Sequence, residues 1–184
     1  MTVIALPRTA LESLGREVRA ASWFAALGEP LTAGERAEAV AYADAFGLGP
    51  LGIAQARDWP EAERLLMIPD GQSGWWEREE TQRKALLAKA EARYPERALW
   101  TALTELTTEA GDLVHGKAAG AAARLGLAAP ASVHVAAGAA SQAVYQLAVT
   151  RLAGEESPLF ENKFRLFAAG RWPLGIVGST LFVF

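Results

Sequence analysis

The fold is decided by residues 96–153, which read ERALWTALTELTTEAGDLVHGKAAGAAARLGLAAPASVHVAAGAASQAVYQLAVTRLA. The run from Glu96 to Leu125 is rich in helix-forming residues and long enough for one helix of about 45 Å. The segment Gly126–Pro130 marks a turn, and residues 131–153 resume a helical composition. Two long helices joined by a short turn predict an αα-hairpin at the centre of the molecule.

An uncharged window of this hairpin, Leu125–Thr150, has the length of a membrane span. Its composition is unsuitable, because alanine, glycine, serine and glutamine replace most of the leucine, isoleucine and phenylalanine that favour transfer into lipid. We therefore expect a buried helix here and no membrane partner.

The rest of the chain also favours helices, because alanine and leucine are abundant and isoleucine is rare. Thr9 and Thr32 each precede a glutamate by three positions, as in a capping box, and Asp58 and Ser157 each precede a first turn that contains proline. These signals predict an all-α, single-domain bundle of about seven helices. Besides the two helices of the hairpin, we expect helices over about residues 10–27, 33–46, 59–67, 75–94 and 158–169.

Charge is distributed unevenly within this single predicted domain, residues 1–184. Residues 1–98 contain 12 basic and 15 acidic side chains, whereas residues 99–184 contain 6 of each. Charged side chains are rarely buried. We therefore expect residues 1–94 to form charged outer helices, and residues 95–184 to form the apolar core helices and a C-terminal hairpin.

The helix predicted over residues 75–94 carries two possible ion pairs. Glu79 precedes Arg83 by four positions, and Glu80 precedes Lys84 by the same spacing. Such pairs support a solvated helix, so this helix is expected at the periphery.

The chain is expected to end in a β-hairpin. Leu174–Val177 and Thr180–Phe184 are rich in β-prone residues, and Gly178-Ser179 between them favours a type II′ turn. Both faces of this hairpin are apolar, and an isolated two-stranded hairpin is only marginally stable in water. Either the domain itself or a partner is therefore expected to cover it.

Composition excludes several classes of function. The sequence has no cysteine, which excludes thiol nucleophiles, cysteine-ligated metal centres and disulfides, and favours a reducing, cytoplasmic location. A net charge of −3 gives no electrostatic footprint for nucleic acid. The sequence contains no phosphate-binding loop and no serine nucleophile elbow, and its one Gly-rich run with dinucleotide-like spacing follows a predicted helix, so no cofactor is predicted.

The strongest candidate for chemistry is a polar stripe on the first helix of the hairpin. Glu105, Glu109, Asp112 and His115 fall on a shared face at helical spacing, where carboxylates and an imidazole are suited to acid–base catalysis. Asp112 and His115 also resemble the Glu-x-x-His spacing of di-metal helical bundles. The opposite face of the helix is apolar, so a simple solvated face is the competing interpretation.

Metal binding at this stripe is not predicted. A di-metal bundle needs two such pairs and further carboxylates, and the sequence offers one pair. A turn centred near residue 128 places His115 opposite Gln142, so His134, the other histidine, is expected about 12 Å away along the helix axis. The two histidines should then not share a metal ion.

Two further groups of residues are candidates for binding. Trp75 and Trp76 are adjacent and point about 100° apart on a helix, so one of them is expected to be exposed, where it would anchor a partner or clasp the neighbouring loop. Ser141, Gln142 and Tyr145 would line a groove beside the alanine-rich surfaces of the hairpin, unless those surfaces simply pack tightly.

The sequence favours a non-enzymatic interaction or regulatory domain that acts as a homo-oligomer or through a protein partner. Few catalytic side chains, an apolar terminal hairpin and the tryptophan pair all favour this hypothesis. The alternative is a helical-bundle enzyme or small-ligand-binding protein that uses the stripe of Glu105, Glu109, Asp112 and His115.

Overall fold

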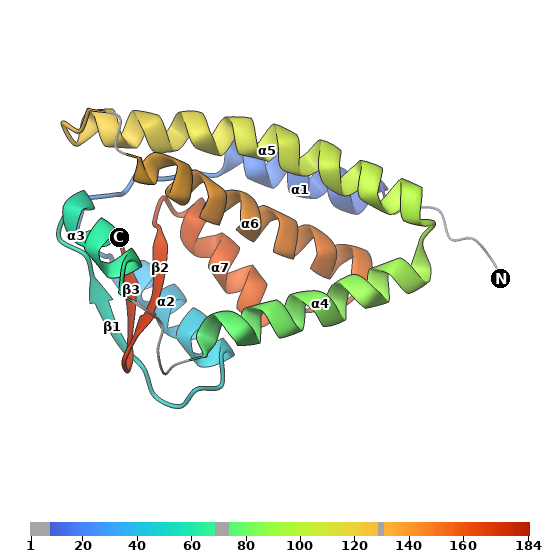
Figure 1. Ribbon diagram of the computed structural model, residues 1–184, viewed down its shortest axis with the longest axis horizontal. Coiled ribbons are helices and arrows are strands. Elements are labelled where there is room, and N and C mark those ends of the chain that lie inside the picture. The colour runs from blue at the N-terminus through green and yellow to red at the C-terminus, as the bar shows by residue number, and fades with distance from the viewer. Residues whose placement is uncertain (1–7, 69–73, 129–130) are drawn as a thin grey trace.

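The computed structural model describes residues 8–68, 74–128 and 131–184 (Figure 1). These residues form seven helices and three strands. In chain order they are α1 (Arg8–Ala20), α2 (Ala33–Ala45), β1 (Gly52–Gln55), α3 (Trp59–Leu66), α4 (Trp75–Arg93), α5 (Glu96–Arg124), α6 (Ser132–Ala153), α7 (Pro158–Ala168), β2 (Pro173–Val177) and β3 (Thr180–Val183). The predicted helices and the C-terminal hairpin are present, but the all-α class is corrected by β1, which joins the hairpin to form a small sheet.

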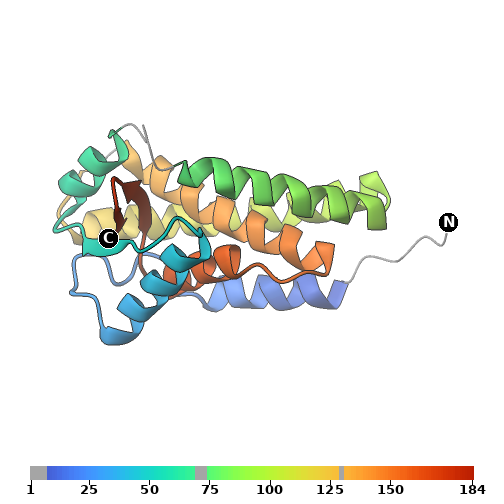
Figure 2. The same cartoon turned by 90° about the horizontal axis from the view of Figure 1, so that it is seen from below.

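Helix α6 forms the centre of the helical part. Helices α1, α4, α5 and α7 all pack against it (Figures 1 and 2). Most of its side chains are buried as a result, which confirms the buried helix expected from the uncharged window. In the part of the chain that the structure describes, no helix has both the length and the apolar composition to cross a membrane. The cytoplasmic location remains a prediction.

The sheet lies at one end of the bundle, beside α2 and α3 (Figure 1). Its strand order is β1-β3-β2, with β3 parallel to β1 and antiparallel to β2. Gly178 adopts φ +61° at the hairpin turn, which suits the predicted type II′ geometry. Leu174, Ile176, Leu181 and Val183 are buried, so the domain itself provides cover for the hairpin.

Helix α1 ends at Ala20, several residues before the predicted end. The chain then becomes irregular, and Phe24 adopts φ +60°, which is unusual for a bulky residue. This departure turns Trp23, Phe24 and Leu27 into the core, where all three are buried. The apolar pattern of residues 10–27 resembles that of a helix, but the apolar side chains after Ala20 pack into the core from an irregular segment.

Candidate functional site

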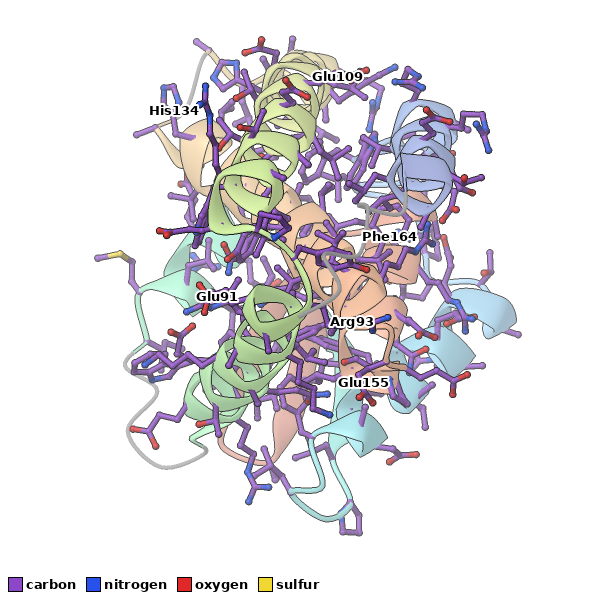
Figure 3. All side chains as sticks on the ribbon, turned by 90° about the vertical axis from the view of Figure 1, so that its right-hand side faces the viewer. Glu91, Arg93, Glu109, His134, Glu155 and Phe164 are labelled. Carbon is purple, nitrogen blue, oxygen red and sulfur yellow. The ribbon has the colours of Figure 1, made fainter. Side chains whose placement is uncertain are left out.

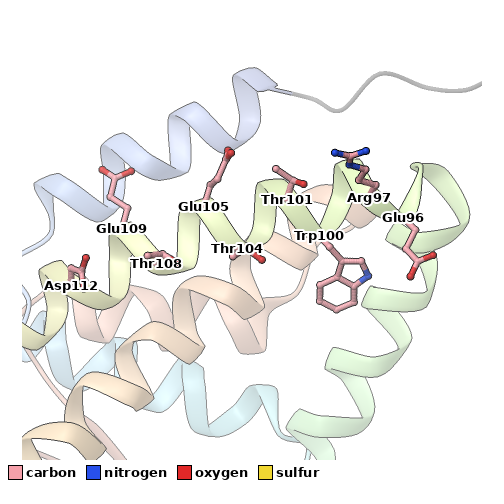
Figure 4. A pocket seen from close by; sticks show the side chains of 9 residues that line it. All are labelled: Glu96, Arg97, Trp100, Thr101, Thr104, Glu105, Thr108, Glu109 and Asp112. Carbon is pink, nitrogen blue, oxygen red and sulfur yellow. The ribbon is translucent and has the colours of Figure 1, made fainter.

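The predicted acidic stripe is exposed on the outer face of α5 (Figure 4). It borders a hollow of about 910 Å³ whose lining residues all belong to this one helix: Glu96, Arg97, Trp100, Thr101, Thr104, Glu105, Thr108, Glu109 and Asp112. Because one helix forms its only described wall, this hollow is an open part of the surface and not an enclosed site. Glu109 accepts a hydrogen bond of 2.5 Å from Arg19 of α1, so this carboxylate already has a partner.

The histidine geometry expected from the sequence is wrong. The rings of His115 and His134 lie against each other, with centroids 4.9 Å apart and planes tilted by 33°. The hairpin reverses direction at Gly126, whose φ is +77°, and Leu127 donates its backbone N–H to the carbonyl of Ala122. Helix α5 therefore extends past the start of α6, which shifts the register between the two helices.

Both histidines are exposed, and Figure 3 shows His134 at the periphery of the molecule. No group of three or more His, Cys, Asp or Glu side chains with metal-binding geometry occurs among the described residues.

Ser141, Gln142 and Tyr145 are brought together, as the sequence predicts. With Thr107 and Gly138 they line a shallow hollow of about 290 Å³ between α5 and α6. The hydroxyl of Tyr145 accepts a hydrogen bond of 3.4 Å from Arg83. The binding role of these residues remains a prediction.

The tryptophan pair divides as expected. Trp76 is 54% exposed, whereas Trp75 is half-buried and packs edge-on against Phe46, with ring centroids 6.1 Å apart. Trp75 also lies directly over Gly175 of β2, where an added Cβ would come within 2.7 Å of the indole. Gly175 adopts φ +130°, so only glycine fits there without strain.

Trp75 thereby forms one wall of a partly enclosed pocket of about 440 Å³, here called the sheet pocket. Its lining comes from α2, α4, α6, α7, β2, β3 and the end of α3, and comprises Tyr42, Leu65, Leu66, Met67, Ile68, Trp75, Val135, Ala139, Lys163, Trp172, Pro173, Leu174, Gly175, Ile176, Val177 and Phe182. Because so many elements contribute, spacing along the sequence does not reveal this pocket.

The sheet pocket is apolar at its mouth and polar at its inner end. Met67 is 82% exposed, and Ile68 and Val135 are about half exposed, so these three side chains form the mouth. Tyr42 and Lys163 are nearly fully buried. They are the side chains of the described lining that carry a hydroxyl group or a charge, and their burial places them at the inner end.

A buried polar cluster holds Tyr42 and Lys163 in place. The carboxylate of Glu79 accepts hydrogen bonds from the Tyr42 hydroxyl at 2.6 Å, the Lys163 ammonium at 2.6 Å and the Gln146 amide at 3.2 Å. Burial and the neighbouring Glu79 carboxylate raise the pKa of Tyr42 well above its ordinary value of 10.0. Tyr42 therefore stays protonated and acts as a donor.

The predicted ion pair between Glu79 and Arg83 is wrong, because Glu79 faces inward. Arg83 instead binds Glu80 at 2.6 Å, and Lys84 lies 3.5 Å from the same carboxylate. One signal for the cluster is present in the sequence. Lys163 follows Phe160 by three positions and therefore lies on the same face of α7 as this aromatic side chain.

The cluster has hydrogen-bonding capacity that its members do not use. An ammonium group carries three N–H donors, and Glu79 is the acceptor recorded for Lys163 among the described residues. The side-chain oxygen of Gln146 is buried without a hydrogen-bond partner in the same set. Lys163 therefore has donors to offer to a ligand.

Comparison with protein-family models, with curated proteins and with solved structures finds no match to this chain, so the function is inferred from the geometry of the site.

Proposed function

We propose that this protein binds a small apolar molecule in the sheet pocket. The observation that carries the proposal is a partly enclosed space of about 440 Å³ with apolar walls and two polar side chains at its inner end. Ligand pockets typically occupy about 300–1,000 Å³ and combine an apolar lining with a few polar groups that orient the ligand. Exposed apolar side chains at the mouth favour the entry of an apolar ligand.

The same geometry favours binding over catalysis. Lys163 is paired with Glu79, and the Tyr42 hydroxyl donates to the same carboxylate. Each of the three groups therefore already has a partner, and none is a free base or an activated nucleophile. This proposal keeps the expected non-enzymatic character and moves the ligand site from α5 to the sheet pocket.

Fluorescence titration with N-phenylnaphthylamine, an uncharged dye that brightens in apolar surroundings, tests the proposal. We expect saturable binding to the wild-type protein and its loss in Ala139→Phe, which fills the pocket. The matched control is Ala41→Phe, because Ala41 is a half-buried alanine of α2 outside the pocket lining. Absence of binding to the wild type, or equal binding by both variants, contradicts the proposal.

A second candidate function is self-association through the exposed surface around Trp76. This side chain is large, apolar and more than half exposed, and exposed tryptophan is frequent at the centre of interfaces. We expect the wild-type protein to form a dimer that Trp76→Gln dissociates, whereas Trp100→Gln on α5 leaves it intact. Light scattering across a concentration series measures this, and a monomeric wild type at every concentration contradicts it.

A further inference from the structure

We infer that the ligand of the sheet pocket is an uncharged oxygenated hydrocarbon, such as a ketone or an alcohol, whose oxygen accepts a hydrogen bond from Lys163. This inference rests on the proposed function and specifies its ligand class. It is carried by three features of the pocket: its charge balance, its spare donors and its apolar walls.

The charge at the inner end is already balanced. The Glu79 carboxylate and the Lys163 ammonium lie 2.6 Å apart, and both side chains are nearly fully buried. Lys163 is the one charged side chain of the described lining, and Glu79, which does not line the pocket, balances its charge. A ligand carboxylate would therefore leave one negative charge uncompensated in a buried site and would compete with Glu79 for Lys163. An uncharged group avoids both costs.

The inner end offers donors to a ligand. Lys163 has N–H groups beyond the one that binds Glu79, and its side chain lines the pocket. The Tyr42 hydroxyl donates its single proton to Glu79, which leaves only its oxygen for a ligand. A carbonyl oxygen of a ligand can accept a hydrogen bond from Lys163. A hydroxyl group of a ligand can accept from Lys163 and also donate to the Tyr42 oxygen.

The remaining lining matches a hydrocarbon body. Trp75, Ala139 and the side chains of β2 supply further apolar surface to the pocket. A second polar group on the ligand would be buried there among mostly apolar side chains, at a cost in affinity. The pocket therefore selects a molecule with its oxygen at one end.

Three naphthalene derivatives of nearly the same shape test the inference by displacing N-phenylnaphthylamine. They are ethylnaphthalene, without oxygen; acetonaphthone, a ketone; and naphthoate, an anion. In the wild-type protein we expect acetonaphthone to displace the dye at a concentration about tenfold below that of either other compound. No variant is needed for this comparison, so it does not depend on the folding of a mutant.

Removal of the charges of Glu79 and Lys163 tests whether this pair causes the preference for the ketone. Glu79→Gln with Lys163→Met removes both charges together, which avoids an unpaired buried ion, and we expect it to abolish the preference for the ketone over ethylnaphthalene. The matched control is Glu17→Gln with Arg151→Met, because this pair joins α1 and α6 at 2.7 Å outside the pocket lining. The control is expected to keep the tenfold preference.

The outcomes separate the two proposals. Equal displacement by the ketone and ethylnaphthalene overturns this inference and leaves the proposed function standing. Tighter binding of naphthoate overturns it in favour of an anionic ligand, and a ketone preference that persists in the cluster variant overturns the role of Lys163. Failure of the dye and all three compounds to bind overturns the proposed function, and the inference falls with it.

Discussion

At the scale of single residues, Arg171 is the most completely bonded charged side chain among the described residues. It is 1% exposed, and its five N–H groups all donate hydrogen bonds. The acceptors are both carboxylate oxygens of Glu35 and the backbone carbonyls of Ala26, Glu29 and Pro30. Arg171 thereby fastens the irregular segment after α1 and the start of α2 to the strand that follows α7.

Substitution of Arg171 by lysine should destabilise the protein by about 3 kcal/mol, because an ammonium cannot reproduce the planar five-donor geometry and would leave buried carbonyls unpaired. Denaturant unfolding measures this loss. The control is Arg165→Lys, since Arg165 is exposed and lies 4.0 Å from Glu38, and its effect should stay within about 0.5 kcal/mol. Equal effects of the two substitutions would contradict the prediction.

Glu35 makes the stability of the protein depend on pH. Hydrogen bonds from Arg171, together with those from the backbone and side chain of Thr32, lower the pKa of Glu35 from 4.5 to about 2. A carboxylate with a lowered folded-state pKa stabilises the fold above its unfolded value, and this contribution is lost as the pH falls from about 4.5 to about 2. The melting temperature of the wild type should exceed that of Glu35→Gln near neutral pH, and the two should converge at about pH 2. A difference independent of pH would show that this linkage is absent.

At the scale of elements, the core of the bundle depends on small side chains. Ala118 of α5 and Ala136 and Ala140 of α6 are fully buried, so these helices approach neighbouring elements closely. The alanine-rich composition of both helices indicated this close packing. It did not predict the register, because the backbone turns at Gly126, which adopts φ +77°, and not at the expected centre near residue 128.

Enlargement of Ala140 tests this close packing. Ala140→Leu should destabilise the protein by about 1–3 kcal/mol, because added methyl groups have no room in a filled core. Ala119→Leu on the exposed face of α5 should change stability by less than about 0.5 kcal/mol. Unfolding of both variants in denaturant gives the comparison, and a neutral Ala140→Leu would mean that the helices have space to spare.

The helices were predictable and the sheet was only partly so, for physical reasons. Capping residues such as Thr32, and proline in a first turn, act locally and mark where helices begin. The hairpin signal at Gly178-Ser179 is equally local. Strand β1 has four residues without polar–apolar alternation, and it exists because β3 offers a free edge for pairing. The residues of β1 carry no signal for the free edge of β3, because that edge forms elsewhere in the chain.

At the scale of the whole molecule, the sheet pocket is a product of the complete fold. Tyr42, Val135 and Lys163 come from three different helices and converge only when the bundle and the sheet are assembled. The stripe of Glu105, Glu109 and Asp112 was visible in the sequence because it lies on one helix. Its side chains are exposed, and Glu109 is bonded to Arg19 of α1.

A ligand of the sheet pocket should stabilise the entire fold. Binding to the native state alone raises the free energy of unfolding by about 2.7 kcal/mol at a ligand concentration about 100 times Kd. Acetonaphthone should therefore raise the melting temperature of the wild type and leave that of Ala139→Phe unchanged. Thermal unfolding with and without the compound measures the shift, and an equal shift in both proteins would place the binding elsewhere.

The parallel pairing of β1 with β3 bears on how the protein folds. It joins Gly52 to Thr180 across most of the chain, and contacts between such distant segments carry a large loop-closure entropy and form slowly. The α5–α6 hairpin, built from neighbouring segments, should acquire amide protection early in refolding, before β1 docks. Partly folded chains would then have a helical core and no ligand site, so the ability to bind would mark the final step of assembly.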